Sequence, residues 1–421
     1  MFHRHAAFAL LYGVGSFLIS NVASAEESPW NVQAAKEVPE FRWLDQSSPI
    51  RSLVYANEPY QGKSTEVFAF YATPGTLKGD SSQDKNLPGV VLIHGGGGTA
   101  FAEWVHLWAK RGYAAIAMDL SGRQPSKPNF DSDGDFITPR SHRDIIRERL
   151  ENGGPEANHV AKFDNVGGDI TDDWQFHAVS ACVRAHSLLR SFPEVDADHT
   201  GVTGISWGGY MTCLVASLDE RFKAAVPVYG CGFLYDGESV QKPLIDGLPD
   251  DQRQQWIETY DPSVWLPRCR VPILFVNGTN DVHYPLNSYL RSYELVPGTK
   301  QIRIEAGMRH SHTHGWQPQE IGLFIDQYCR NGTPLPQILN LVQKNGMLKA
   351  QLKSEDGSLS ARLHFTTDSG RLAERKWNVT ELAPKDGEIT TQIPPDATIC
   401  LISITDSRGA MVSTVPVFVS N

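Results

Sequence analysis

A serine stands in a sequence pattern that fits a nucleophile. Residues 204–208 read Gly-Ile-Ser-Trp-Gly and match G-x-S-x-G, with another glycine directly after them. The pattern is typical of a sharp strand-to-helix turn, where small residues let the strand and the helix approach closely. An apolar strand pattern precedes Ser206 and a helical pattern follows over 208–218. We therefore predict that Ser206 attacks an acyl carbon and that the backbone N–H of Trp207 faces the developing oxyanion.

A glycine-rich segment earlier in the chain predicts a second oxyanion donor. Residues 94–98 read His-Gly-Gly-Gly-Gly and follow the apolar run 89–93. Glycines let backbone N–H groups approach a substrate, so we expect the N–H of Gly96 to complete the oxyanion hole, with Gly97 as the alternative donor. Phosphate binding is the other use of such a loop. The G-x-G-x-x-G order and a Walker lysine are both absent here, which favours the oxyanion role.

A nucleophilic serine needs a base, and the base needs a carboxylate that orients it. In this kind of fold the chain order is serine, acid, histidine. Asp281 lies in a glycine-containing turn after the apolar run 271–276, where the acid is expected. Asp246 and Asp261 lie too far from a strand end to compete. We therefore predict Asp281 as the acid.

Three alternating histidines follow the next predicted strand. Residues 307–314 read Gly-Met-Arg-His-Ser-His-Thr-His. His310 is nearest the strand end and precedes a small residue, so we predict it as the base, with His312 and then His314 as alternatives. An H-x-H-x-H run can also bind a metal, but no carboxylate or cysteine is spaced to complete such a site. We expect neither a metal nor another cofactor.

Beyond the motif itself, three segments resemble known families. Residues 204–212, the His-Gly-Gly loop and the Asn-Gly-Thr-Asn-Asp turn at 277–281 resemble the prolyl oligopeptidase family of serine peptidases. The same segments are similar to acetyl xylan esterases and dienelactone hydrolase-like proteins. The acid turn, residues 294–298 and a terminal β-module also resemble PhoPQ-activated pathogenicity-related proteins. The resemblance covers about residues 88–330 and implies an α/β-hydrolase fold.

The resemblance to the peptidases has two departures. Prolyl oligopeptidases carry a large β-propeller, for which the segment before residue 88 is too short; this favours an esterase. In addition, Arg309 stands where the family usually has a glycine before its histidine.

The chain divides into segments with different sequence patterns. Buried-strand patterns alternate with helical patterns over 26–335, which predicts a mostly parallel sheet flanked by helices, the catalytic domain. Within it, residues 121–172 are polar and irregular, as in a lid-like insertion that shapes a substrate site. Residues 336–421 show short alternating segments and predict a small C-terminal all-β sandwich like an immunoglobulin or fibronectin type III module. We expect the sandwich to be structural, with glycan binding as the alternative.

The N-terminus and the composition predict where the protein works. Residues 1–25 have a basic start, an apolar stretch and Ala-Ser-Ala at the end, as in a cleaved signal peptide. No later segment is apolar enough to span a bilayer, so we predict a periplasmic or extracellular protein. The net charge of −10 and the scattered Lys and Arg argue against nucleic acid as a partner.

These patterns predict an exported serine hydrolase. We expect a carboxylic-ester hydrolase similar to acetyl xylan esterases, acting on a small-molecule or polysaccharide ester. A serine peptidase related to the prolyl oligopeptidase family, acting on peptides, is the first alternative. An inactive hydrolase fold that serves as a binding module is the second, although a full set of serine, acid and histidine argues against it.

Overall fold

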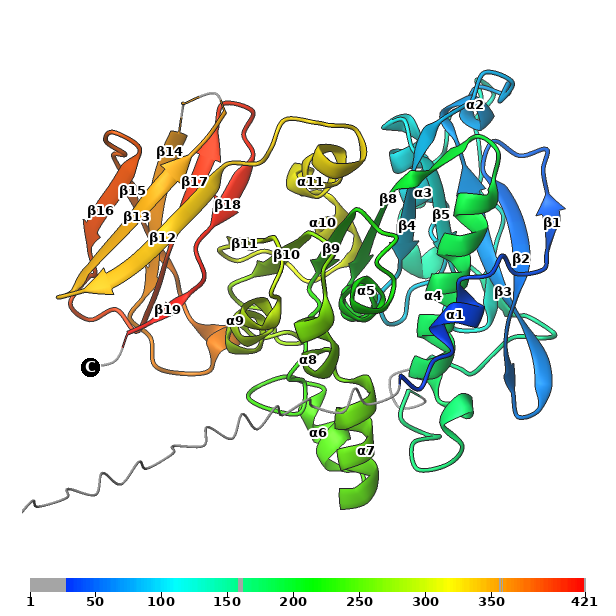
Figure 1. Ribbon diagram of the computed structural model, residues 1–421, viewed down its shortest axis with the longest axis horizontal. Helices are drawn as coiled ribbons and strands as arrows, with labels where there is room; N and C mark the ends of the chain where they lie inside the picture. Colours follow the sequence, from blue (N-terminus) through cyan, green and yellow to red (C-terminus); the bar gives the residue numbers. More distant parts are fainter. Residues whose placement is uncertain (1–27, 158–161, 356, 358, 420–421) are drawn as a thin grey trace, which may run out of the picture.

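A nine-stranded mixed sheet forms the centre of the molecule in the computed structural model, which describes residues 28–157, 162–355, 357 and 359–419 (Figure 1). In spatial order the strands are β1 (Phe41–Asp45), β2 (Arg51–Tyr60), β3 (Lys63–Ala72), β5 (Ala114–Met118), β4 (Leu87–Ile93), β8 (Val195–Ile205), β9 (Ala224–Val228), β10 (Ile273–Gly278) and β11 (Lys300–Glu305). The neighbouring pairs from β1 to β5 are antiparallel, and the neighbouring pairs from β5 to β11 are parallel.

Helices cover this sheet, as an α/β-hydrolase fold requires. The central strands β4 and β5 are apolar on both faces, and such strands are stable only with helices packed on each side. The longer helices are α3 (Ala102–Lys110), α4 (Trp174–Ser191), α5 (Trp207–Leu218), α7 (Asp250–Tyr260), α9 (Leu286–Leu295) and α11 (Gln319–Cys329). The short ones are α1 (Val32–Ala35), α2 (Pro74–Leu77), α6 (Lys242–Asp246), α8 (Pro262–Trp265), α10 (His312–Trp316), η2 (Ile170–Asp172) and η3 (Leu266–Arg268).

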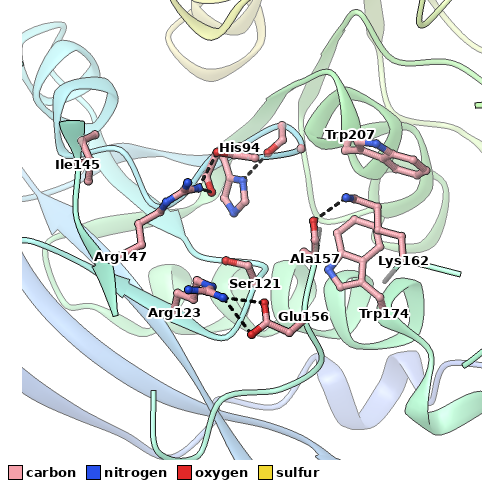
Figure 2. A pocket seen from close by; sticks show the side chains of 14 residues that line it. His94, Ser121, Arg123, Ile145, Arg147, Glu156, Ala157, Lys162, Trp174 and Trp207 are labelled. Carbon is pink, nitrogen blue, oxygen red and sulfur yellow. Dashed lines mark hydrogen bonds and ion pairs between the residues drawn. The ribbon is translucent and has the colours of Figure 1, made fainter. Parts of the chain in front are cut away.

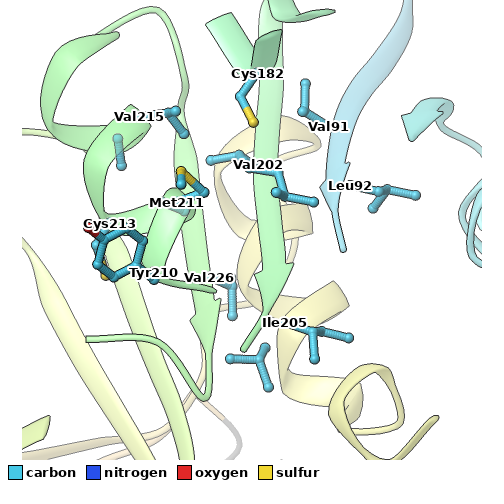
Figure 3. Close-up of a cluster of buried hydrophobic side chains, with 14 of the residues drawn as sticks. Val91, Leu92, Cys182, Val202, Ile205, Tyr210, Met211, Cys213, Val215 and Val226 are labelled. Atoms are coloured by element: carbon cyan, nitrogen blue, oxygen red, sulfur yellow. The ribbon is translucent and has the colours of Figure 1, made fainter. Parts of the chain in front are cut away.

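A buried apolar cluster lies behind the predicted nucleophile. Val202 and Ile205 of β8 pack among side chains of α5, β4 and β9, and Cys182 of α4 lies nearby (Figure 3). All of these side chains are almost fully buried. Protein interiors pack as densely as organic crystals, so this layer fixes the end of β8 and the start of α5 relative to each other.

The region predicted as an insertion contains little regular structure. It holds η1 (His142–Asp144) and a two-stranded ribbon of β6 (Arg123–Pro125) and β7 (Arg147–Arg149). The ribbon is tied to the main domain because the Arg147 guanidinium donates to the backbone oxygens of Gly97 and Gly98. The ribbon therefore lies against the glycine-rich loop.

Antiparallel strands form the C-terminal region, as the sequence predicted. One sheet has the order β12-β13-β16, and the other contains β15-β14-β17-β18 with β19 also paired to β17. The elements are β12 (Gln337–Lys344), β13 (Met347–Lys353), β14 (Leu359–Thr366), η4 (Leu372–Glu374), β15 (Asn378–Leu382), β16 (Glu388–Gln392), β17 (Ile399–Asp406), β18 (Met411–Ser413) and β19 (Val417–Phe418). The sequence predicted short alternating segments here without β12 and β15, and it took residues 412–419, where the structure has β18 and β19, as one segment.

The C-terminal region packs beside the β11 edge of the large sheet (Figure 1). The Ser413 hydroxyl accepts from the backbone N–H of Ile304, and the Glu320 carboxylate accepts from that of Met411. A second contact involves η4, where the Asn280 side chain donates to the backbone oxygens of residues 373 and 375. The η4 segment of this region thus touches the turn that carries Asp281.

The described residues show the state of the cysteines and whether any helix could cross a membrane. All six cysteines are buried free thiols. No helix in the described ranges has the length and apolarity needed to cross a lipid bilayer. The predicted signal peptide, residues 1–25, lies outside the described residues.

Candidate active site

Ser206 occupies a strained turn between β8 and α5. Its φ is 59° and its ψ is −119°, a left-handed conformation that non-glycine residues rarely adopt. A Cβ on Gly204 would lie 2.1 Å from the oxygen of Gly208, and one on Gly208 would lie 2.0 Å from the oxygen of Ile93. Only glycine fits at these two positions, which is why the G-x-S-x-G spacing produces the turn. The turn presents the serine side chain at the carboxyl edge of the sheet.

The structure brings Ser206, His310 and Asp281 together. The Nε2 of His310 lies 2.9 Å from the Oγ of Ser206, and its Nδ1 lies 2.6 Å from Oδ2 of Asp281. Asp281 is buried, whereas the His310 side chain is 20% exposed. This is the arrangement in which a histidine takes a proton from a serine while a carboxylate fixes its tautomer.

The acid is held by its own turn. Oδ1 of Asp281 accepts hydrogen bonds from the backbone N–H groups of His283 and Tyr284, at 2.8 and 2.9 Å. Oδ2 is therefore left to face His310. Asn277, the last but one residue of β10, donates to the backbone oxygen of Tyr284 and closes the turn.

Aromatic side chains set the orientation of the base. The Tyr229 ring lies 4.6 Å from the His310 ring, and the His283 ring lies 4.4 Å from it. The hydroxyl of Tyr229 donates to the backbone oxygen of Arg309, directly before the base. Tyr229 thus holds the backbone directly before His310, and Asp281 holds the imidazole.

His312, the alternative base, has a different partner. Its Nε2 accepts from the backbone N–H of Gly95 at 3.0 Å, and its ring lies 4.7 Å from that of Phe101. Burial lowers the pKa of His312 to about 3, so the ring is neutral and its proton is on Nδ1. His312 therefore holds the glycine-rich loop, and His310 is the histidine at the serine. His314 contacts the hydroxyl of Ser311.

The glycine-rich loop is held at several further points. The N–H of Leu120 donates to Nε2 of His94, so Nδ1 of His94 carries the proton and donates to the oxygen of Gly95. On the outer side, Nη1 of Arg147 donates to the oxygens of Gly97 and Gly98. A loop of four glycines is intrinsically free, and these contacts restrict it.

The two predicted oxyanion donors lie next to each other. A Cβ on Gly96 would lie 2.8 Å from Cδ1 of Trp207, so Gly96 packs directly on the indole. Trp207 is the first residue of α5, a position whose N–H has no acceptor within the helix. Since the N–H of Gly95 is bound to His312, Gly96 is the next residue of the loop that can donate.

A cavity of about 410 Å³ opens beside these donors (Figure 2). The glycine-rich loop and Trp207 form one side, and residues of the region 121–172 form much of the rest. Three of its basic residues were not predicted from the sequence: Arg123, Arg147 and Lys162. These three residues belong to no sequence motif. Only the polar, irregular sequence of residues 121–172 indicated that this region could line a substrate site.

No group of histidines, cysteines and carboxylates in the described part of the chain is arranged to hold a metal ion. The three alternating histidines diverge to the serine, to the glycine-rich loop and to Ser311. The H-x-H-x-H run thus places its imidazoles at separate partners.

A family comparison covers the segments that hold these residues. Residues 75–310, more than half of the chain, match the model of the dienelactone hydrolase family. The chain belongs to that family. The matched range contains the serine turn, the acid turn and His310.

Individual relatives of this family member cover only part of it. It is 26% identical to acetyl esterase Axe7A of Xylanibacter ruminicola over 47% of the chain and 43% of that protein. It is 23% identical to the uncharacterized peptidase YuxL of Bacillus subtilis over 59% of the chain and 34% of that protein. The chain thus spans less than half the length of these curated relatives.

Solved structures show the same fold. An acetyl xylan esterase from Paenibacillus sp. R4 superposes with a TM-score of 0.53 at 19% identity, covering 71% of this chain and 92% of that one. Acetyl xylan esterase 1 from Thermoanaerobacterium sp. JW/SL YS485 gives 0.50 at 17% identity, covering 70% and 92%. At such identities the likeness establishes the α/β-hydrolase fold.

Proposed function

We propose that the protein is an exported carboxylic-ester hydrolase that works through an acyl-enzyme on Ser206. The observation that carries this proposal is the chain of contacts from Ser206 to His310 to Asp281, at 2.9 and 2.6 Å. Its substrate is a small-molecule or polysaccharide ester. The relative named an acetyl esterase supports the choice of an ester.

The geometry supports a two-step reaction. His310 takes the proton of Ser206 as the oxygen attacks the acyl carbon, and then returns it to the leaving alcohol. Asp281 keeps the imidazole in the tautomer that accepts from the serine. The N–H groups of Gly96 and Trp207 stabilise the oxyanion, and a water activated by His310 then releases the acid. The reaction needs no cofactor.

Replacing the nucleophile tests this proposal directly. Ser206→Ala should lower kcat for p-nitrophenyl acetate by at least about 1000-fold, because no acyl-enzyme can form. Labelling by a fluorophosphonate probe should disappear in the same variant, while circular dichroism should match the wild type. A folded Ser206→Ala protein that hydrolyses the ester at the wild-type rate contradicts the proposal.

A peptidase is the second candidate, favoured by the similarity to the peptidase YuxL. The same serine, histidine and acid can cleave an amide if the leaving amine is protonated. Hydrolysis of aminoacyl or prolyl naphthylamides faster than of acetyl esters would replace the esterase assignment. A folded wild-type protein that takes no fluorophosphonate label would instead favour a binding module without activity.

Export is tested by the mature N-terminus. We expect cleavage after Ala25, so the secreted protein should begin at Glu26. Mass spectrometry of the protein purified from the medium or periplasm measures this. Recovery of the full-length chain from the cytoplasm alone contradicts it.

A further inference from the structure

Tyr284 is a buried tyrosine in the turn between β10 and α9 (Figure 1). Its backbone N–H donates to Oδ1 of Asp281, and its backbone oxygen accepts from the side chain of Asn277. The turn that holds the acid of the candidate triad therefore also fixes the backbone of Tyr284.

The side chain of Tyr284 lies beside the base. Its ring is nearly parallel to the His310 ring, with 6° between the two planes and 6.2 Å between the ring centres. The Nε2 of His310 in turn lies 2.9 Å from Oγ of Ser206. Tyr284 is 0% exposed. It thus belongs to the layer of side chains around the candidate triad, where bulk solvent does not reach it.

The hydroxyl of Tyr284 is buried, yet it has no hydrogen-bond partner among the described residues. Burial raises the pKa of Tyr284 well above its usual value, and an interaction with the side chain of Ser206 lowers it in part. The phenol therefore keeps its proton at neutral pH, and the nucleophile is among the groups close to it.

A buried hydroxyl without a partner is costly, and most buried hydroxyls in proteins are hydrogen-bonded. Hydrogen bonds of an active site are often long or misaligned before the substrate binds, and they tighten during the reaction. Oγ of Ser206 carries the most negative charge while its proton moves to His310 and its bond to the acyl carbon is incomplete. A donor beside Oγ therefore stabilises the transition state more than the resting enzyme.

We propose that Tyr284 is a further catalytic residue, whose hydroxyl donates a hydrogen bond to Oγ of Ser206 in the transition state. The proposal rests on the proposed function and adds a fourth side chain to its mechanism. The phenol keeps its own proton throughout, while the proton of Ser206 passes to His310. When the acyl-enzyme is hydrolysed, the same hydrogen bond stabilises Oγ as its bond to the acyl carbon breaks and His310 returns the proton.

Tyr284→Phe removes the hydroxyl and keeps the ring beside His310. Because one hydrogen bond is lost in the transition state alone, kcat/KM should fall about 10-fold. The loss should be similar for the acetate esters of p-nitrophenol, phenol and ethanol, since Oγ attacks the same acyl carbon in each. The rate of labelling by a fluorophosphonate probe should fall by a similar factor, because labelling also requires attack by Oγ.

Stability gives an independent measurement. The wild type buries a hydroxyl without a partner, so Tyr284→Phe should have a urea midpoint equal to or above that of the wild type. The matched control is Tyr55→Phe on β2. Tyr55 is also buried, but its hydroxyl donates to the backbone oxygen of Ala181. This control should have a lower urea midpoint and the wild-type rates of hydrolysis and labelling.

The possible results are distinct. Wild-type rates in Tyr284→Phe would overturn the proposal. A urea midpoint below that of the wild type would overturn it as well, because the hydroxyl would then have a structural partner. A loss confined to one leaving alcohol, with labelling unchanged, would place the hydroxyl at the substrate alcohol instead of at Oγ. Failure of the proposed function looks different: the wild type would hydrolyse none of the three esters and take no fluorophosphonate label.

Discussion

His310 and His312 are two residues apart in the chain, yet they serve two different parts of the site. His310 lies in the loop after β11 and contacts Ser206, whereas His312 begins α10 and contacts Gly95. The order of serine, acid and histidine was sufficient to predict Ser206, Asp281 and the histidine segment. It could not decide among the histidines, because that depends on where the backbone turns into α10.

His312→Ala should slow catalysis without removing the candidate triad. The loop would lose the acceptor for the N–H of Gly95, and Gly96 would no longer be held in place. Because one oxyanion donor contributes about 100- to 1000-fold, we expect kcat to fall about 10- to 100-fold with little change in KM. Steady-state kinetics measure this.

The loss should also be constant between pH 5 and pH 9, since the His312 ring is neutral over that range. The matched control is His199→Ala. His199 lies on β8, and its ring pairs with Asp196. A His312→Ala enzyme with unchanged kcat would show that the loop does not need this contact.

At the scale of elements, apolar runs predicted the buried parts well. The apolar runs at 89–93 and 271–276 and the helical pattern over 208–218 fall on β4, β10 and α5 of the structure. The short helices α6 and α8 were missed. Each has a proline in its first turn and mixes polar with apolar residues. Strands β12 and β15 were missed because most of their side chains are exposed and leave no clear alternation.

Asn280 joins two elements that are distant in the sequence, the acid turn and η4. Asn280→Ala removes the two hydrogen bonds that its amide donates, and carbonyl groups of the C-terminal region lose their donor. We expect the free energy of unfolding to fall by about 1–3 kcal/mol and kcat to fall with it, because Asp281 is the next residue. Urea denaturation and ester hydrolysis measure the two effects.

The control for this variant is Asn340→Ala on β12. Asn340 donates to Gln351 within the C-terminal region and does not touch the acid turn. Equal effects of the two substitutions on kcat would argue against a connection between η4 and the acid.

At the scale of the whole molecule, several histidines are buried in their neutral form. Burial lowers the pKa of His177 and of His186 to about 4, below the value of about 6.5 in an unfolded chain. The unfolded state therefore binds more protons than the folded state between pH 6.5 and pH 4. Stability is lost as the pH falls through this range. Burial raises the pKa of Asp173 to about 6 and also raises that of Asp261, which opposes the trend.

We therefore expect the urea midpoint to fall steadily from pH 6.5 to pH 4.5 and to change little from pH 6.5 to pH 7.5. His186→Gln should reduce the slope, because it removes one of the groups that gain a proton on unfolding. Asn340→Ala, which removes no titratable group, should leave the slope as in the wild type. A midpoint that is flat between pH 6.5 and pH 4.5 would contradict the expectation.

Because every cysteine is buried, we expect the native protein not to react with thiol reagents. A maleimide dye would therefore find no reactive side chain on the folded surface of the described residues. Ile146 lies between η1 and β7 and is 67% exposed, so a cysteine introduced there would be labelled selectively. A fluorophore at that position would stand next to Arg147, which holds the glycine-rich loop, and would report in a simple titration whether a ligand binds beside that loop.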